Sequence, residues 1–235
     1  MTLDINEALR SFDSRSAVML SMNTAAVTLA LHLVTGVLAG YFLTGKKTFL
    51  RSLADTAVTL PLIFPPIATG FLLLLLLGRN GIIGRPLQSA GIETIFSTTG
   101  VYTASFVAGL PLVVKSVQSA IETMDRSLLE ASWTLGKSRT ETYIKVVLPH
   151  IRYALFTGLV LSLGRSFGEV GITLMLGGNI SGKTETMSLA IYNAVFEGNF
   201  EKAALLSIML AVISLGMFAI LKKISRTGNE SRTVA

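Results

Sequence analysis

The chain has 235 residues, of which 51% are hydrophobic and only 14% are charged. Soluble domains carry about 25% charged residues, so this composition, with a mean hydropathy of +0.63, excludes an ordinary soluble domain and indicates an integral membrane protein. The net charge of +6 indicates either an acidic or nucleic-acid partner or basic residues gathered in cytoplasmic loops, and the positions of those residues decide between the two.

Residue types that carry metal or thiol chemistry are scarce. The sequence has no cysteine, so it offers neither disulfides nor thiolate ligands. The two histidines, His32 and His150, are too few for a metal cluster. We therefore expect no metal site.

Five apolar segments are candidates for membrane spans, because a bilayer core of about 30 Å needs about 20 mostly apolar residues as helix. They cover approximately residues 18–43, 56–77, 97–120, 147–176 and 203–221. Residues 1–17 are polar and lack the basic start of a signal peptide, so the first span should be retained. The sequence thus predicts an all-α membrane domain over 18–222, preceded by a polar segment and followed by a short tail, 223–235.

The basic residues lie unevenly on the two sides of such a five-span chain. Thirteen of the 20 lysines and arginines fall in or beside the first and third loops and the C-terminal tail, six fall on the other side, and Arg165 lies within the fourth segment. The positive-inside rule then places the N-terminus outside and the C-terminus in the cytoplasm. This topology explains the net charge, so we expect no nucleic-acid partner.

Two short helices are predicted in the third loop. Ser127 and Glu130 have the spacing of a capping box, and Gly136 is suited to the left-handed conformation that ends a helix. Ser138 and Glu141 form a second capping box. The local chemistry therefore predicts a helix near 127–136, a stop, and a second helix.

The first of these helices has the surface of a docking element. Leu128, Ala131 and Leu135 form a narrow apolar stripe, and the small residues Ala131 and Ser132 should allow a partner to approach closely. Pro149 should bend or begin a helix, so that the loop meets the fourth span at an angle. By spacing alone, a capped interfacial helix in which Glu130 only completes the cap also fits.

The segment Glu130-Ala-Ser-Trp-Thr-Leu-Gly136, with Leu148-Pro149 further on, resembles the EAA loop of ATP-binding-cassette (ABC) importer permeases. Ser132 and Val146 are mild departures in size from that pattern. In this family the loop is a short cytoplasmic helix that fits a cleft on a separate ATPase. The residues that the resemblance assigns to ATPase coupling are Ser127, Glu130, Ala131, Ser132, Gly136, Leu148 and Pro149.

The second predicted span contains Pro61, Pro65 and Pro66, which interrupt helical hydrogen bonding. Such breaks persist in a membrane only when they are buried in protein or face a cavity. The broken end near Thr69 would expose amide donors that could help to pass an anion. A kink packed by neighbouring helices is an equally good explanation.

Arg165 and Glu169 are four residues apart in the fourth span, so they share a helix face and can pair. Ionisable groups in a span should point away from lipid. Arg165 could favour a passing oxyanion while Glu169 limits its dwell time, and a salt bridge that braces the span against a second copy fits slightly better. With Pro65, Pro66 and Thr69, these residues are our candidates for the translocation pathway.

Four further segments, residues 60–70, 78–84, 164–171 and 178–186, resemble the molybdate permeases among the ABC importers. Val170 stands where many of these permeases carry Phe, and tungstate permeases also show Glu-Val-Gly. The resemblance implies a type I importer transmembrane domain for molybdate, with tungstate or sulfate as alternatives.

The resemblance also implies the partners: a second copy of the chain, two ABC ATPase subunits, membrane lipid and an external oxyanion-binding protein. The external segment 177–200 could contact that binding protein, and its stretch 187–195 could equally be a short interfacial helix. No phosphate-binding loop is present in the sequence, so ATP and Mg would be used by the partner and the chain would need no cofactor.

The expected activity is therefore alternating access in the cytoplasmic membrane of a bacterium or archaeon, with no reaction catalysed by this chain. An ATP-independent channel or secondary transporter is a weaker alternative, because its coupling residues would have to be Arg165 and Glu169. A membrane-embedded enzyme is weaker still, because the sequence shows no convincing catalytic arrangement.

Overall fold

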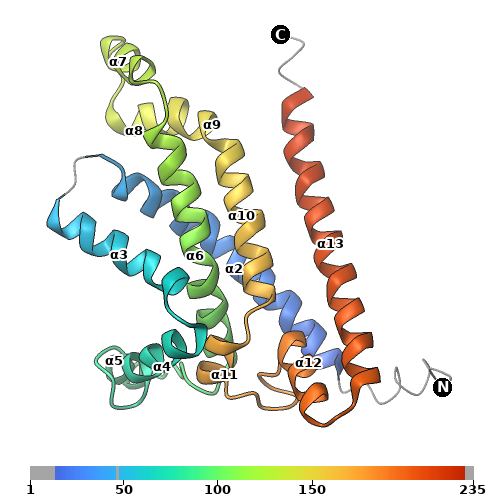
Figure 1. The fold of residues 1–235 in the computed structure, drawn as a ribbon. Helices are drawn as coiled ribbons and strands as arrows, with labels where there is room; N and C mark the ends of the chain where they lie inside the picture. Colours follow the sequence, from blue (N-terminus) through green and yellow to red (C-terminus); the bar gives the residue numbers. More distant parts are fainter. Residues whose placement is uncertain (1–13, 46–47, 231–235) are drawn as a thin grey trace.

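The computed structural model describes residues 14–45 and 48–230, and within these ranges it is helical throughout, with no strand (Figure 1). Most of the predicted N-terminal segment, 1–13, lies outside the described residues, as do 46–47 and 231–235. Ser14 to Ala17, predicted as part of that segment, belong instead to the first helix. Residues 223–230, predicted as tail, continue the last helix.

The helices follow one another through short connections. Their bounds are α2 (Ser14–Leu43), α3 (Phe49–Ile63), α4 (Pro66–Leu77), α5 (Gly84–Ser89), α6 (Thr98–Glu122), α7 (Arg126–Thr134), α8 (Arg139–Thr142), the π-helix η1 (Tyr143–Val147), α9 (Leu148–His150), α10 (Arg152–Phe167), α11 (Gly171–Gly177), α12 (Met187–Phe196) and α13 (Phe200–Glu230).

Three helices in the described part are long and apolar enough to cross a membrane: Ser16–Leu43, Thr98–Glu122 and Phe200–Ala219. They correspond to the first, third and fifth predicted spans. A fourth candidate is the bent pair Arg139–His150 and Arg152–Phe167, whose halves meet at 68°. The bend lies directly after Pro149. A bend is expected there because proline has no backbone N–H to donate to the preceding turn.

The second predicted span, 56–77, is interrupted at Pro65 and Pro66, as predicted, whereas the predicted interruption at Pro61 is wrong, because Pro61 lies inside α3. The span divides into α3 and α4, because Phe64 and Pro65 are extended, with ψ of 146° and 137°, and the helix restarts at Pro66. A residue before proline is driven out of the helical region. The fourth span, 147–176, is also interrupted, between Phe167 and Gly171. Mean hydropathy depends only on composition, so it does not reveal where a helix is interrupted.

Helix α6 is the centre of the fold and packs against both α2 and α10, which also contact each other (Figure 1). The three helices approach closely because glycines face bulkier residues. A Cβ on Gly36 or Gly40 of α2 would lie 2.1 and 2.3 Å from methyl groups of Val113 and Val117, respectively. A Cβ on Gly158 of α10 would lie 2.9 Å from Ser116. Small residues at helix crossings of this kind are typical of membrane bundles.

His32 crosses this interface as a buried polar bridge. Its side chain is 0% exposed, and its Nε2 lies 2.8 Å from the Phe106 carbonyl oxygen. Its ring also stacks on that of Phe106, with centroids 5.3 Å apart. His32 therefore joins α2 to α6, and the structure gives it a packing role.

Helix α12, which covers the predicted stretch 187–195, buries one face against α2 and α13. Met187, Leu189 and Ala194 are fully buried, and the Met187 N–H donates to Ser21 Oγ at 2.9 Å. This burial supports packing as the role of the stretch.

Gly109 of α6 is a position where a side chain would meet three different residues at once. We expect Gly109→Ala to destabilise the protein by roughly 1–3 kcal/mol, the usual cost of overpacking, because the new Cβ would lie 2.5 Å from the His32 ring, 2.7 Å from Ser166 Oγ and 2.8 Å from Ser162 O. The midpoint of thermal unfolding in detergent should fall. Gly216→Ala is the control: it is also helical, and its Cβ would meet nothing within 4 Å. Equal midpoints for the two variants would contradict this packing.

Candidate functional site

Helix α7 lies at one end of the molecule, with α8, while α4, α5 and α11 lie at the other end (Figure 1). Its N-cap is Asp125, whose carboxylate accepts the Ser127 N–H at 2.9 Å. The prediction that Ser127 is the N-cap is therefore wrong: an equally good cap two residues earlier captures the helix start. The hydrogen bond from the Ser127 backbone also holds the pKa of Asp125 below its usual value.

The earlier start changes what Glu130 can do. With Asp125 as the N-cap, Glu130 lies two positions beyond the third helical position, so it cannot close a capping box. Its carboxylate is exposed and forms no hydrogen bond or ion pair with any described residue. The explanation of Glu130 as a helix cap is thus excluded, and a conspicuous acidic group remains without a partner inside the described chain.

The end of α7 follows the predicted chemistry. Gly136 has φ of +74°, and its N–H donates to the Trp133 carbonyl at 2.9 Å. A Cβ there would meet nothing within 4 Å, so the backbone conformation alone favours glycine. Ser138 then caps α8 by accepting the Glu141 N–H at 3.2 Å. Both local predictions are confirmed.

The surface of α7 divides into a buried anchor and an exposed apolar face. Ser132 is buried, and its hydroxyl lies 2.9 Å from that of Thr142, which ties α7 to α8. Ser132 therefore serves internal packing, and the prediction that it lets a partner approach is wrong. Leu128, Ala131 and Leu135 are exposed, Leu135 to 79%, so the apolar stripe is uncovered within this chain.

The loop returns to the membrane helices through a rigid connection. Tyr143–Val147 form a π-helix, and Leu148 and Pro149 begin the short α9. Val147 and Ile151 are buried with Val113 and Met124 in one cluster, against which Leu148 packs. The Tyr143 hydroxyl donates to the Val37 carbonyl of α2 at 2.9 Å. The α7 loop is thus connected directly to α2, α6 and α10.

The two broken helices restart side by side at the other end. A Cβ on Gly171 would lie 2.8 Å from Pro66 Cβ, and one on Gly70 would lie 3.0 Å from the Ile172 backbone, so α4 and α11 pack in parallel with adjacent N-termini. Pro65 and Pro66 are exposed. Thr69 is only 3% exposed, and its hydroxyl has no partner among the described residues.

Arg165 and Glu169 form the predicted ion pair, but they do not share a helix face as predicted, because α10 ends at Phe167 and Glu169 lies in the connection to α11. Glu169 also accepts the Ile172 N–H at 2.7 Å, so it caps the start of α11. The Glu169 side chain is 1% exposed and that of Arg165 is 30% exposed. The pair therefore braces two helices of the same chain, while Arg165 alone keeps access to the surface.

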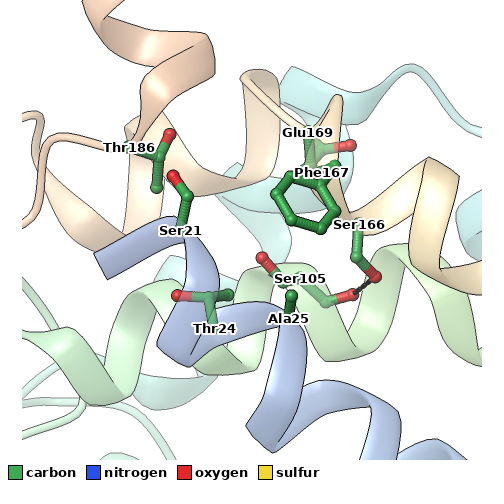
Figure 2. A pocket seen from close by; sticks show the side chains of 8 residues that line it. All are labelled: Ser21, Thr24, Ala25, Ser105, Ser166, Phe167, Glu169 and Thr186. Carbon is green, nitrogen blue, oxygen red and sulfur yellow. Dashed lines mark hydrogen bonds between the residues drawn. The ribbon is translucent and has the colours of Figure 1, made fainter. Parts of the chain in front are cut away.

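A small polar cavity lies beside this brace (Figure 2). Ser166 donates to the Ser105 carbonyl at 2.8 Å, and the Thr24 hydroxyl has no partner among the described residues. The cavity offers about 10 Å³ to the centre of a water molecule, which is room for about one water and excludes a tetrahedral oxyanion. Its lining is Ser21, Thr24, Ala25, Ser105, Ser166, Phe167, Glu169 and Thr186.

Sequence reasoning missed most of this cavity. The available signal was a row of small hydroxyl residues, Ser21, Thr24 and Thr28, at helical spacing in the apolar first span. The hydroxyl groups of such residues can also donate to a carbonyl of their own helix, as Thr28 does to the Thr24 carbonyl at 2.7 Å. The pattern alone therefore does not separate a cavity wall from an ordinary span.

The long apolar helices, the broken helices and the exposed loop define a multi-pass membrane transport protein. The chain belongs to the family described as binding-protein-dependent transport system inner membrane component, whose model matches residues 32–227. This membership confirms the resemblance to ABC importer permeases and, with the helical structure, the all-α membrane fold class.

The chain is similar in sequence to two transport permeases with named cargo. The chain is 35% identical over 205 residues to the molybdenum transport system permease protein ModB of Haemophilus influenzae, covering 85% of this chain and 90% of ModB. It is 36% identical over 225 residues to the chloroplastic sulfate permease 2 of Chlamydomonas reinhardtii, covering 94% of this chain but only 60% of that permease.

A solved structure supports the fold. A chain of the bacterial alginate ABC transporter, in complex with an alginate pentasaccharide-bound periplasmic protein, matches with a TM-score of 0.77 at 18% identity, covering 97% of this chain and 83% of that one. At this identity the match shows a shared fold.

The ion pair at the α10–α11 break can be tested by removing each partner in turn. We expect Glu169→Ala to destabilise the protein by roughly 2–4 kcal/mol, because it leaves a buried N–H and Arg165 unpaired. Arg165→Ala should cost roughly 3–5 kcal/mol, because it leaves the Glu169 carboxylate, whose side chain is only 1% exposed, without its counter-ion. Thermal unfolding in detergent measures both. A loss below about 1 kcal/mol for Arg165→Ala, the usual value of an exposed pair, would show that the ion pair does not brace the break.

Proposed function

We propose that the chain is the permease subunit of an ATP-driven ABC importer that moves molybdate across the cytoplasmic membrane of a bacterium or archaeon by alternating access. The observation that carries the proposal is α7, an exposed helix whose carboxylate, Glu130, and apolar stripe have no partner in the described chain. The match over nearly the whole length of ModB supports the cargo.

Helix α7 is the element that would contact the ATPase. Its exposed Leu128, Ala131 and Leu135 suit a groove, which buries apolar area, and Glu130 would add a charged contact at the edge. Ser132 and Gly136 would act indirectly, by fixing α7 on α8 and by ending it. Two copies of the chain would each hold one ATPase, which uses ATP and Mg. This chain itself would catalyse no reaction and need no cofactor.

The connection from α7 to the membrane helices supports a mechanical role. A push on α7 would pass through Ser132 and Thr142 to the π-helix, and from there to α2 through Tyr143 and to α10 through Leu148 and Pro149. Closely packed elements move as bodies because interiors do not deform continuously. ATP-driven closure of the ATPases would in this way reorient the two copies and open the path outward.

The path for the anion would lie between two copies of the chain, because the polar cavity inside one copy holds only about one water. The exposed prolines Pro65 and Pro66, near Thr69, place the start of α4 at a surface. Arg165 would add a positive charge that Glu169 largely compensates. Such a route guides an anion without holding it.

Sulfate is the second candidate cargo, because the chloroplastic sulfate permease 2 is as similar in identity as ModB. Tungstate remains a third, through the Glu-Val-Gly at residues 169–171. All three are tetrahedral dianions, which an external binding protein would select before the permease receives them.

The cargo is tested by titrating the cognate external binding protein with molybdate, tungstate and sulfate in a calorimeter. We expect molybdate to bind at least about tenfold more tightly than sulfate, a difference of about 1.4 kcal/mol. Retention of sulfate in preference to both metal oxyanions would make this a sulfate importer and leave the docking proposal intact.

Docking is tested by charge reversal on α7. We expect Glu130→Arg to abolish copurification of the ATPase in detergent and transport in proteoliposomes, because it places a cation where the partner meets a carboxylate. Glu122→Arg is the control, since Glu122 is an exposed carboxylate in the same region but on α6. Retained ATPase binding by Glu130→Arg, with normal transport, would refute the role of α7.

A further inference from the structure

Helices α4 and α5 lie at the end of the molecule opposite α7 (Figure 1). Residues of these helices and of the connections beside them line a pocket of about 480 Å³. It lies between the connection from α4 to α6 and the connection from α11 to α12. Its apolar part includes Ile92, Phe96 and Ile180, and its charged residues are Arg79, Lys183 and Glu93. None of the candidate site residues named above lines it.

The first wall of this external pocket is a glycine-rich turn, residues 78–84, in which the glycines leave no room for a side chain. The Ile83 N–H donates to the Leu76 carbonyl at 3.1 Å, and a Cβ on Gly84 would lie 1.9 Å from the Gly78 carbonyl oxygen. The glycines therefore make a turn whose backbone atoms leave no room for a Cβ. Arg79 extends from this turn.

The second wall is fixed to α11. The Thr94 hydroxyl donates to the Leu77 carbonyl at 2.9 Å, and the Phe96 N–H donates to the Leu176 carbonyl at 2.7 Å. Phe96 has φ of 54°, a costly conformation for an aromatic residue, and its ring occupies the space beside Gly178. Phe96 is nevertheless about half exposed, at 52%.

The third wall is the turn that carries Lys183. The Ile180 N–H donates to Thr184 Oγ1 at 2.9 Å, and the Thr184 N–H returns to the Ile180 carbonyl at 2.9 Å. Beside it, the Asn179 and Asn193 amides bond to each other at 2.7 and 3.2 Å. All three walls are thus fixed by hydrogen bonds or close packing, so a partner would meet a preformed surface.

The external pocket carries a net positive charge. Arg79 and Lys183 are exposed, and no carboxylate among the described residues lies within 4.0 Å of either. With Glu93 present, the pocket keeps a net charge of one positive unit. The apolar wall and the net charge of only one positive unit match a protein surface that brings apolar contacts and a single carboxylate better than a free dianion.

We propose that the external pocket receives an acidic side chain of the oxyanion-binding protein, with Arg79 and Lys183 as its ionic partners and Phe96 as the apolar contact. This inference rests on the proposed function, because it requires an external binding protein. Rigid walls lower the entropy lost on docking. The ionic partners would orient the binding protein over the start of the path.

The test uses the complete importer, permease with its cognate ATPase, in nanodiscs of zwitterionic lipid. The probe is the cognate binding protein loaded with molybdate, and its affinity is measured at low and high salt. We expect Arg79→Glu with Lys183→Glu to weaken binding at least about fivefold at low salt and to flatten its salt dependence. If charge reversal prevents assembly of the importer, the double variant Arg79→Gln with Lys183→Gln is used instead. It should weaken the binding of the binding protein about twofold.

The matched control is Arg85→Glu, which reverses an exposed charge on α5, outside the pocket lining. It should change the affinity less than about twofold. Equal affinity of the double variant and the unmodified importer would overturn the proposal, and so would an equal loss in Arg85→Glu.

Two further outcomes would assign the pocket to another ligand. If the double variant loses only the binding of molybdate without binding protein, the pocket holds the free anion. If it keeps its affinity for the binding protein in zwitterionic nanodiscs, and in parallel nanodiscs that contain anionic lipid it loses only a dependence on that lipid, the pocket holds a headgroup. Failure of the unmodified importer to bind either ATPase or binding protein would instead refute the proposed function itself.

Discussion

The close crossing of α2, α6 and α10 is the constraint on which the rest of the molecule depends. Apolar side chains gain little by moving from lipid into a membrane protein, so contact between helices must come from packing. Gly36 and Gly40 on α2, and Gly158 on α10, supply that contact by removing side chains where the helices meet. His32 adds one buried hydrogen bond to it. This three-helix core is the fixed frame for both ends of the molecule.

The three-helix core allows the broken helices to be stable in the membrane. Unpaired amides in lipid cost several kcal/mol each, and a span that stops midway exposes several. Here the start of α11 is satisfied by Glu169, and that of α4 lies against α11, which packs on α6. The ion pair with Arg165 keeps the capping carboxylate in place. The break is thus a stable part of the fold.

Local chemistry made part of this structure predictable. The stop at Gly136, the cap at Ser138 and the bend after Pro149 each depend on one residue and its neighbours, so the sequence was enough. Asp125 and Ser127 are equally good caps two positions apart, and only packing selects between them. The break at Pro65 was visible, but the average hydropathy of 56–77 concealed its effect on the span.

Other features depend on contacts between distant segments. Ser132 is buried because Thr142 lies opposite it, which spacing along one helix does not reveal. The wider turn of η1 has no sequence signature of its own. The external pocket joins residues about 100 positions apart, Arg79 and Lys183, and each by itself is an ordinary exposed cation.

The π-helix gives the connection between α8 and the membrane helices a tolerance of one residue. It holds one residue more in its turn than an α-helix would, so the wider turn takes up that residue without changing the direction in which the flanking segments face. Losing one residue from Tyr143–Val147 would therefore close the turn to an ordinary α-helical one and leave α7 facing nearly the same way. The same loss from a regular α-helix would rotate everything beyond it by about 100°.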